Sequence, residues 1–241
     1  MRALILVLAI GLGACQPARL ANLPAEVDAY LQALSAVEKA DSPVSLEPLL
    51  AAAGAAQDKL MEIQPGSDQA WQETLSDKDY QTLRQQLRGL QLSRGQDVYA
   101  QPDGAFLNRL AQAHGRPEDQ AFFALYASLW TEEMLPKYLN LGTGQAPCVR
   151  FGDGIVSALY REWWAYWTAN APHYADFTMQ VLRDLEEVVE LGTCACGDVE
   201  SVRKELRDFT GTFPHSPATP AAQLRLAELS REDVDHYVHC R

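Results

Sequence analysis

Apolar residues recur at intervals of three and four along most of the chain, which is the spacing of one face of an α-helix. After Pro24, a residue that suits a first helical position, Val27, Leu31 and Leu34 follow this spacing. The same spacing, with capping residues and prolines at helix starts, predicts further helices over about 45–63, 76–90, 105–114, 117–131, 155–170, 172–191, 199–210, 220–229 and 231–240. Pro136 is expected to interrupt or restart a helix between residues 132 and 140.

The helical pattern fails clearly in two places, residues 93–103 and 142–154, both rich in glycine, proline and other turn-forming residues. Valine and isoleucine seldom alternate with polar residues, and no Asn-Gly or Asp-Gly pair lies between two apolar runs. The sequence therefore predicts an all-α fold. We expect a helical bundle or small domain over residues 23–92 and a domain of helical hairpins over 105–241.

Two segments of the C-terminal part match at an offset of 42 residues. Both place a Pro-His pair, Pro172-His173 or Pro214-His215, between two predicted helices, where the histidine is most simply a helix-entry residue. The flanking matches pair Trp167-Thr168, Leu182-Arg183 and Glu186 with Phe209-Thr210, Leu224-Arg225 and Glu228. A unit of this size is typical of repeats that stack into α-solenoids, although two copies are fewer than a self-supporting array needs. Chance similarity between two helical segments is the alternative.

The second copy contains Phe213-Pro214-His215-Ser216-Pro217 followed by an alanine- and leucine-rich helix. These roughly twenty residues resemble the F-P-x-S-P turn of tetratricopeptide-type outer-membrane lipoproteins. The Trp, Leu-Gly and Tyr signature of that repeat is missing at its usual spacing, and the offset is longer. The resemblance implies a helical protein-binding scaffold and nothing finer.

The first residues have the pattern of an export signal. Met1 and Arg2 precede an apolar run of about ten residues, too short to span a bilayer as a helix. The run ends in Leu12-Gly13-Ala14-Cys15, which resembles the lipobox of bacterial lipoproteins. The resemblance implies a signal peptide over 1–14, lipidation of Cys15 and a tether over 15–22. An ordinary secretory signal followed by an incidental cysteine is the alternative.

The chain is acidic, with a formal net charge of −12 at pH 7. This charge argues against nucleic acid as a partner and against broad electrostatic docking on anionic lipid, since both need clustered Lys and Arg. A basic protein partner would be attracted to such a surface. The alternative is that the acidity only keeps the protein in solution.

Four further cysteines, Cys148, Cys194, Cys196 and Cys240, form an even set, as expected for two disulfides in an exported protein. Three pairings are possible. A bond between Cys194 and Cys196 would close a very small, strained ring, so we expect each of them to pair with a distant partner. Cys148 and Cys240 would then both be attached to the loop 193–197.

Large aromatic residues are concentrated in the predicted helix 155–170, where Tyr160, Trp163, Trp164 and Trp167 fall on one face. Such a stripe is either part of the core, which is the commoner case, or a surface that binds a partner through aromatic anchors.

Catalytic and metal-binding signals are weak. His236 and His239 beside Cys240 have ligand types and spacing suited to zinc, but disulfide formation competes with zinc binding outside the cytoplasm. Clustered carboxylates are most simply solvated helix faces, among them Glu132-Glu133, Asp184 with Glu186-Glu187-Glu190, and Asp198 with Glu200. No G-x-S-x-G, His-Glu-x-x-His or phosphate-binding loop is present, so we expect no cofactor and no metal.

Together these features predict a lipid-anchored lipoprotein of the bacterial outer membrane that faces the periplasm and binds another protein. Gln16 after Cys15 resembles the sorting pattern of outer-membrane lipoproteins, and this resemblance implies the outer membrane. The partner would be an envelope assembly protein, or a basic toxin or lysozyme neutralised by an inhibitor or immunity protein. An envelope enzyme that acts on peptidoglycan through carboxylates or histidines is the alternative.

Overall fold

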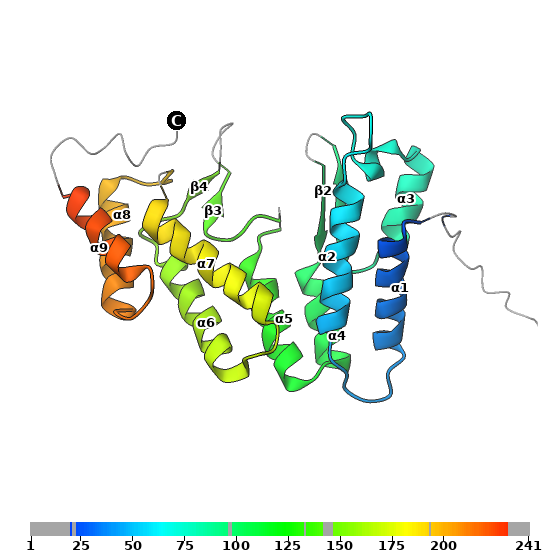
Figure 1. Cartoon of the computed structure of the whole chain (residues 1–241), viewed down its shortest axis with the longest axis horizontal. Coiled ribbons are helices and arrows are strands. Elements are labelled where there is room, and N and C mark those ends of the chain that lie inside the picture. The colour runs from blue at the N-terminus through cyan, green and yellow to red at the C-terminus, as the bar shows by residue number, and fades with distance from the viewer. Residues whose placement is uncertain are drawn as a thin grey trace, which may run out of the picture.

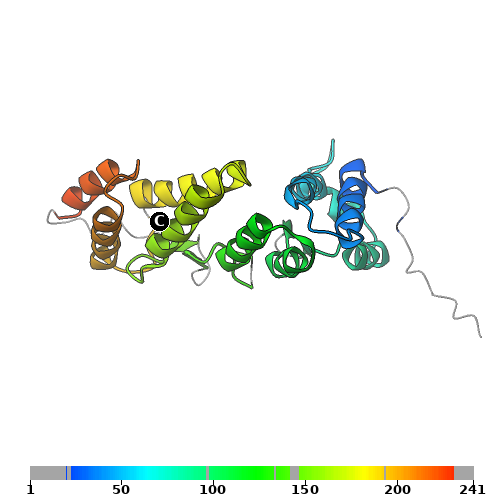
Figure 2. The same cartoon turned by 90° about the horizontal axis from the view of Figure 1, so that it is seen from below.

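A computed structural model describes residues 20, 23–95, 98–132, 134–141, 147–192 and 194–230 of the chain. Nine α-helices in these residues form an elongated molecule, with the first three helices at one end of its long axis and the last two at the other (Figure 1, Figure 2). The predicted predominance of helices is confirmed. The predicted signal segment 1–14, Cys15, nearly all of the tether 15–22, the predicted helix 231–240 with His236 and His239, and Cys240 lie outside the described residues.

The first two helices, α1 (Ala25–Glu38) and α2 (Glu47–Met61), form an antiparallel pair (Figure 1). The buried face of α1 has the predicted helical spacing. Its fully buried members include Val27, Tyr30 and Leu34. The hydroxyl of Tyr30 donates a hydrogen bond of 2.6 Å to the carbonyl of Arg88, which ties α1 to the chain that follows the third helix.

After the short 3₁₀ helix η1 (Trp71–Thr74), helix α3 (Asp77–Gln86) begins at the predicted Ser76-x-x-Asp79 cap. The Ser76 hydroxyl oxygen accepts the Asp79 backbone N–H at 3.2 Å. The helix ends earlier than predicted because the chain turns at Gly89, where φ is +82°. A Cβ at this position would lie 2.6 Å from the Tyr30 hydroxyl oxygen, so both the conformation and the space require glycine.

A β-hairpin follows where the sequence predicted the end of a helix and a turn. Strands β1 (Leu90–Arg94) and β2 (Val98–Pro102) are antiparallel, with Leu92 opposite Ala100. Leu90 and Leu92 are buried while Gln91 is exposed, which is the two-residue alternation of a strand. The prediction of a strictly all-α fold was therefore wrong. Leu90 also lies seven residues after Leu83, so its position alone fits a helical face equally well.

Helices α4 (Gly104–His114) and α5 (Pro117–Leu129) lie close to their predicted bounds. Asp103 caps α4 by accepting the Phe106 N–H at 2.9 Å. The turn between the two helices contains Gly115, and Pro117 occupies the first position of α5.

A buried carboxylate connects α5 to segments that lie before and after this helix in the chain. Asp119, fully buried in the first turn of α5, accepts the backbone N–H groups of Arg116 at 2.8 Å and of Leu46 at 3.0 Å. It also accepts the hydroxyl of Tyr174, from the turn before the seventh helix. The start of α2, the start of α5 and this turn are therefore held by one side chain.

The helix expected around Pro136 does not form. Strand β3 (Leu139–Asn140) instead pairs antiparallel with β4 (Cys148–Val149). The residue before a proline disfavours helical backbone, and Pro136 forms an isolated β-bridge with Trp130.

Two helical hairpins complete the described chain: α6 (Ile155–Asn170) with α7 (Ala175–Leu191), and α8 (Val199–Thr212) with α9 (Thr219–Glu228). Helix α6 has its predicted bounds, and the other three lie within about three residues of theirs. Each hairpin has a Pro-His pair in its turn, as the 42-residue correspondence predicted. The matched leucines differ, since Leu182 is buried and Leu224 is 69% exposed, so the two copies share a hairpin shape but not a common environment.

The buried apolar residues from Val27 to Leu229 form one continuous core. This core joins the part of the chain before residue 92 to the part after residue 105. Its aromatic centre lies where α5, α6 and α7 meet. There the ring of Phe122 stacks on Tyr174 with centroids 3.8 Å apart, and Trp163 contacts Phe122 edge-on at 5.8 Å. None of the helices in the described part of the chain is long and apolar enough to cross a membrane.

Candidate functional site

Helix α6 divides its aromatic residues between the core and the surface. Trp163 and Tyr160 are buried, Trp167 is partly buried against the core, and Trp164 is 42% exposed. The sequence places these four side chains on one face of the helix but does not separate the buried ones from the exposed one. The face is wider than the area that the neighbouring helices cover. Of the four, Trp164 offers the most surface to a partner.

The exposed face of Trp164 borders a hollow of about 200 Å³ between α6 and the turn that joins α8 to α9. The Tyr160 and Trp164 rings form one wall, nearly parallel at an interplanar angle of 12° with centroids 6.1 Å apart. Phe213 stands edge-on to Tyr160 at 4.9 Å, and Pro214, His215 and Ser216 complete the lining. The structure thus brings the aromatic helix together with the Phe-Pro-His-Ser turn of the second hairpin. We call this hollow the aromatic pocket.

Tyr160 fixes the base of the aromatic pocket. Its hydroxyl donates to the Glu186 carboxylate at 2.7 Å and lies 3.0 Å from the Ser216 hydroxyl. Burial raises the pKa of Tyr160 to about 12, and the Glu186 carboxylate adds to this increase while the Ser216 hydroxyl opposes it. The phenol is therefore neutral at physiological pH and holds α6, α7 and the turn in a fixed arrangement.

A second hollow of about 430 Å³ adjoins the aromatic pocket and shares Thr212 with it. Its lining is mostly polar and includes Ser157, Arg161, Arg207 and Asp208. The Arg161 guanidinium carbon lies 5.8 Å from the centre of the Phe213 ring, a cation–π contact that spans the two hollows. We call this second hollow the arginine pocket.

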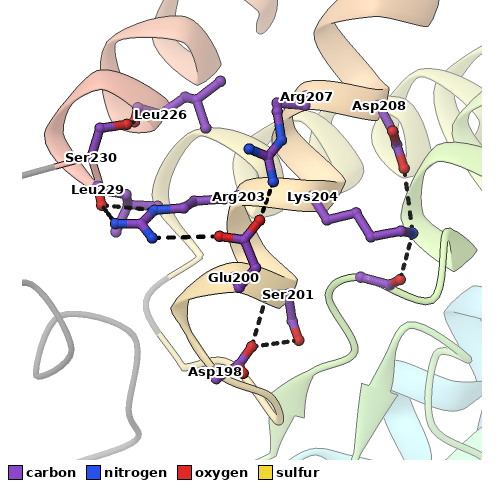
Figure 3. A network of polar contacts seen from close by, with 11 residues as sticks. Asp198, Glu200, Ser201, Arg203, Lys204, Arg207, Asp208, Leu226, Leu229 and Ser230 are labelled. Atoms are coloured by element: carbon purple, nitrogen blue, oxygen red, sulfur yellow. Dashed lines mark hydrogen bonds and ion pairs between the residues drawn. The ribbon is translucent and has the colours of Figure 1, made fainter.

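The exposed face of α8 beside the arginine pocket carries a network of ion pairs (Figure 3). Glu200 pairs with Arg207 and, at 3.4 Å, with Arg203. Hydrogen bonding from Arg207 lowers the pKa of Glu200. Lys204 lies 3.4 Å from Asp208 and donates to the Gly152 carbonyl at 2.8 Å. The basic side chains of α8 therefore have acidic partners on the same helix.

Beneath this face, Glu205 is fully buried and binds the start of α6. One carboxylate oxygen accepts the N–H groups of Gly152 and Gly154, each at 3.1 Å, and the other accepts the N–H and hydroxyl of Ser157. A negative charge at a helix N-terminus is favoured by the helix dipole. Glu205 thus sets the position of α8 relative to α6, and with it the shape of both pockets.

The disulfide in the described residues ties β4 to the loop that precedes α8. Cys148 on β4 is bonded to Cys196, which lies 48 residues later in the loop before α8. The loop also joins β4 through a bridge between Val149 and Ala195. Cys194 is disulfide-bonded as well, so neither loop cysteine is a free thiol.

The remaining candidate groups that the structure describes lie apart from one another. No group of three or more His, Cys, Asp or Glu side chains in the described ranges is arranged to hold a metal ion. His173 lies 3.4 Å from Glu47 and 3.9 Å from Glu118, while His215 is exposed at the aromatic pocket. Glu132 and Asp103 line a separate hollow of about 230 Å³ beside Trp130, and Glu133 lies outside the described residues.

Sequence reasoning identified Trp164 and the Phe213–Ser216 turn but missed Arg161 and Glu205. For Glu205 a signal existed: it lies on the same helical face as Val202, Leu206 and Phe209, all of which are buried. A carboxylate among apolar neighbours needs hydrogen-bond donors from elsewhere in the fold. No protein-family model, curated protein or solved structure matches this chain, so the geometry of the site alone indicates its chemistry.

Proposed function

We propose that this protein is a periplasm-facing lipoprotein, anchored through Cys15, that binds another protein and has no catalysis of its own. Its C-terminal hairpins form a short α-solenoid-like stack, and the aromatic pocket on that stack is the contact site. The Leu12-Gly13-Ala14-Cys15 sequence supports the anchor. The packing of α6 with α8 and of α7 with α9 supports the stack.

The observation that carries the binding proposal is the exposure of Trp164 at the aromatic pocket. An indole that is 42% exposed and lies nearly parallel to a buried tyrosine ring has the properties of an interface anchor. Tyr160, hydrogen-bonded at its hydroxyl and buried, gives the wall a fixed position before a partner arrives. Preorganisation of this kind reduces the entropy lost on binding.

The two carboxylates that are fully buried in the described part of the chain support binding over catalysis. General acid–base chemistry needs a carboxyl group that reaches the substrate. Asp119 and Glu205 instead accept hydrogen bonds from backbone N–H groups at helix starts. A scaffold for envelope assembly and an inhibitor or immunity protein both fit such a site, and the net charge of −12 suits a basic partner.

A photo-crosslinking experiment in cells tests the binding proposal. A photoreactive amino acid at exposed Thr168, one turn after Trp164 on α6, samples the aromatic pocket without replacing its indole. We expect a defined protein adduct that is lost with Trp164→Ala, whereas a photoreactive residue at exposed Gln32 on α1 gives no such adduct. An adduct unaffected by Trp164→Ala would contradict the proposed site.

Two further experiments test the lipid anchor at Cys15 and the alternative of an envelope enzyme. Cys15→Ser should abolish incorporation of labelled palmitate and release the protein from the membrane fraction. Hydrolysis of purified peptidoglycan by the mature protein, lost with Glu132→Gln, would support the envelope-enzyme alternative instead.

A further inference from the structure

We infer that the two adjoining pockets bind the C-terminal residue of the partner protein. Its free carboxylate pairs with Arg161, and its aromatic or aliphatic side chain enters the aromatic pocket. This inference rests on the proposed function, because it specifies which part of the partner occupies the same site.

The requirement for a negatively charged group in the ligand comes from Arg161. The other cations of this surface are paired, Arg207 with Glu200 and Lys204 with Asp208. Arg161 forms no ion pair with any of the residues that the structure describes, and its guanidinium lies over the Phe213 ring. A guanidinium held against an aromatic face still offers its N–H donors at the edge, and a carboxylate matches that planar donor set. The arginine pocket is therefore suited to one anionic group.

The requirement for an apolar side chain in the ligand comes from the aromatic pocket. Its volume of about 200 Å³ corresponds to roughly six or seven water molecules, which is the scale of one large side chain. The stacked Tyr160 and Trp164 rings and the Phe213 edge present mostly apolar atoms to it. An apolar or aromatic side chain would displace water from these surfaces at little cost in hydrogen bonds.

The position of the two pockets next to one another favours a chain terminus as their occupant. Because both are lined by Thr212, their occupants lie next to one another. A C-terminal residue carries its carboxylate and its side chain on the same Cα, so one residue can place its side chain in the aromatic pocket and its carboxylate in the arginine pocket.

The overall charge of the molecule limits which proteins can deliver such a group. A net charge of −12 repels an acidic protein at long range, even though the site itself accepts one carboxylate. A basic protein that ends in an apolar residue satisfies both conditions. The surface charge would bring it close, and Arg161 would recognise its terminus.

Peptide display tests this inference with the full mature protein. One library carries random heptapeptides attached through their amino ends, so that every member ends in a free carboxylate. A second library is attached through its carboxyl ends. We expect enrichment only from the first library, towards peptides whose last residue is aromatic or aliphatic. Failure to enrich a terminal apolar residue, or equal enrichment from both libraries, would overturn the inference.

The enriched peptide is then compared with its C-terminal amide by fluorescence anisotropy. The amide should bind roughly tenfold more weakly, the expected loss for one charge-assisted contact. Arg161→Gln should weaken the acid by a similar factor and remove the difference between acid and amide. Trp164→Ala should weaken both forms, and Arg183→Gln, at an exposed arginine of α7, serves as the matched control with unchanged affinity. Circular dichroism verifies that each variant is folded.

The outcomes separate this inference from the proposed function. If the protein adduct at Thr168 depends on Trp164 but not on Arg161, the site binds a protein through another segment, such as an internal acidic residue. The proposed function then stands and the C-terminal inference fails. If inorganic phosphate or acetate at millimolar concentration competes as well as the acid peptide does, Arg161 is only a general anion site, and the inference also fails.

Discussion

The carboxylate of Glu205 on α8 accepts both the backbone N–H and the hydroxyl of Ser157 in the first turn of α6, at 3.1 and 2.8 Å. The two residues are 48 positions apart in the sequence. Because Ser157 and Arg161 share one face of α6, this contact determines where the arginine pocket lies relative to α8. The stability of the fold and the shape of the proposed binding site are therefore coupled at Glu205.

Glu205→Gln should destabilise the protein by about 2–4 kcal/mol, since it removes a buried charge that accepts four hydrogen bonds and turns a donor towards N–H groups. Chemical denaturation at pH 7 measures the change. Glu200→Gln on the same helix is the control, and its exposed ion pairs predict a much smaller effect. Equal midpoints for the two variants would show that the Glu205 contacts do not stabilise the fold.

The Cys148–Cys196 disulfide gives a second prediction. Closing a loop of 48 residues stabilises a protein by about 4 kcal/mol in the chain-entropy model. Replacing both cysteines by alanine should therefore lower the unfolding free energy by a similar amount. Alkylation of the untreated protein followed by peptide mass mapping provides the independent check, because label on Cys148 or Cys196 without prior reduction is incompatible with the bond.

Helix positions were predictable because their signals are local. Ser76, Asp103 and Pro117 each mark a helix start through contacts or conformational limits within four residues. Apolar spacing then fixes the buried face, as for Val27 and Leu34 on α1. Neither signal depends on the rest of the fold.

The β-hairpin was missed because its signal is short and partly shared with a helix. Within β1 the alternation of buried and exposed residues covers only Leu90, Gln91 and Leu92, because Ser93 and Arg94 are both partly buried. The decisive interactions are made with distant residues: Gly89 packs beneath Tyr30 of α1, and β2 packs on α2. Tertiary contacts of this kind override local propensity.

The site was predictable only in pieces. The sequence pointed to Trp164 as part of an aromatic stripe and to Phe213 as part of a turn, but nothing local brings them together. Their meeting depends on the packing of α6 against α8 and on the Glu205 contact with Ser157. The role proposed for Arg161 likewise depends on the position of Phe213 below its guanidinium.

Alkaline pH should destabilise the protein through its buried tyrosines. Burial raises the pKa of seven of them above the ordinary value: Tyr30, Tyr80, Tyr126, Tyr138, Tyr160, Tyr166 and Tyr174. An unfolded tyrosine loses its proton near pH 10, so above this pH the folded state binds more protons than the unfolded state. The unfolding free energy is therefore unaffected by these groups below about pH 10 and falls as the pH rises further.

Tyr138→Phe isolates one of these groups, since burial raises the pKa of Tyr138 to about 12. The variant should lose stability less steeply between pH 10 and 12, by up to about 1.4 kcal/mol per pH unit, with little change at pH 7. Denaturation series at pH 8, 10 and 11 measure the slope, and absorbance at 295 nm follows the phenolate. An unchanged slope would contradict the assignment of Tyr138 to the buried group.

The adjacent residues Trp163 and Trp164 should respond differently to substitution, because one is fully buried and the other is 42% exposed. Trp163→Ala should cost about 3–5 kcal/mol by leaving a cavity in the core, whereas Trp164→Ala should cost about 1 kcal/mol or less. Trp164→Phe should shift the tryptophan emission to shorter wavelength and reduce quenching by acrylamide, and Trp163→Phe should shift it to longer wavelength. Shifts in the same direction would place both indoles in similar surroundings and remove the surface anchor on which the binding proposal depends.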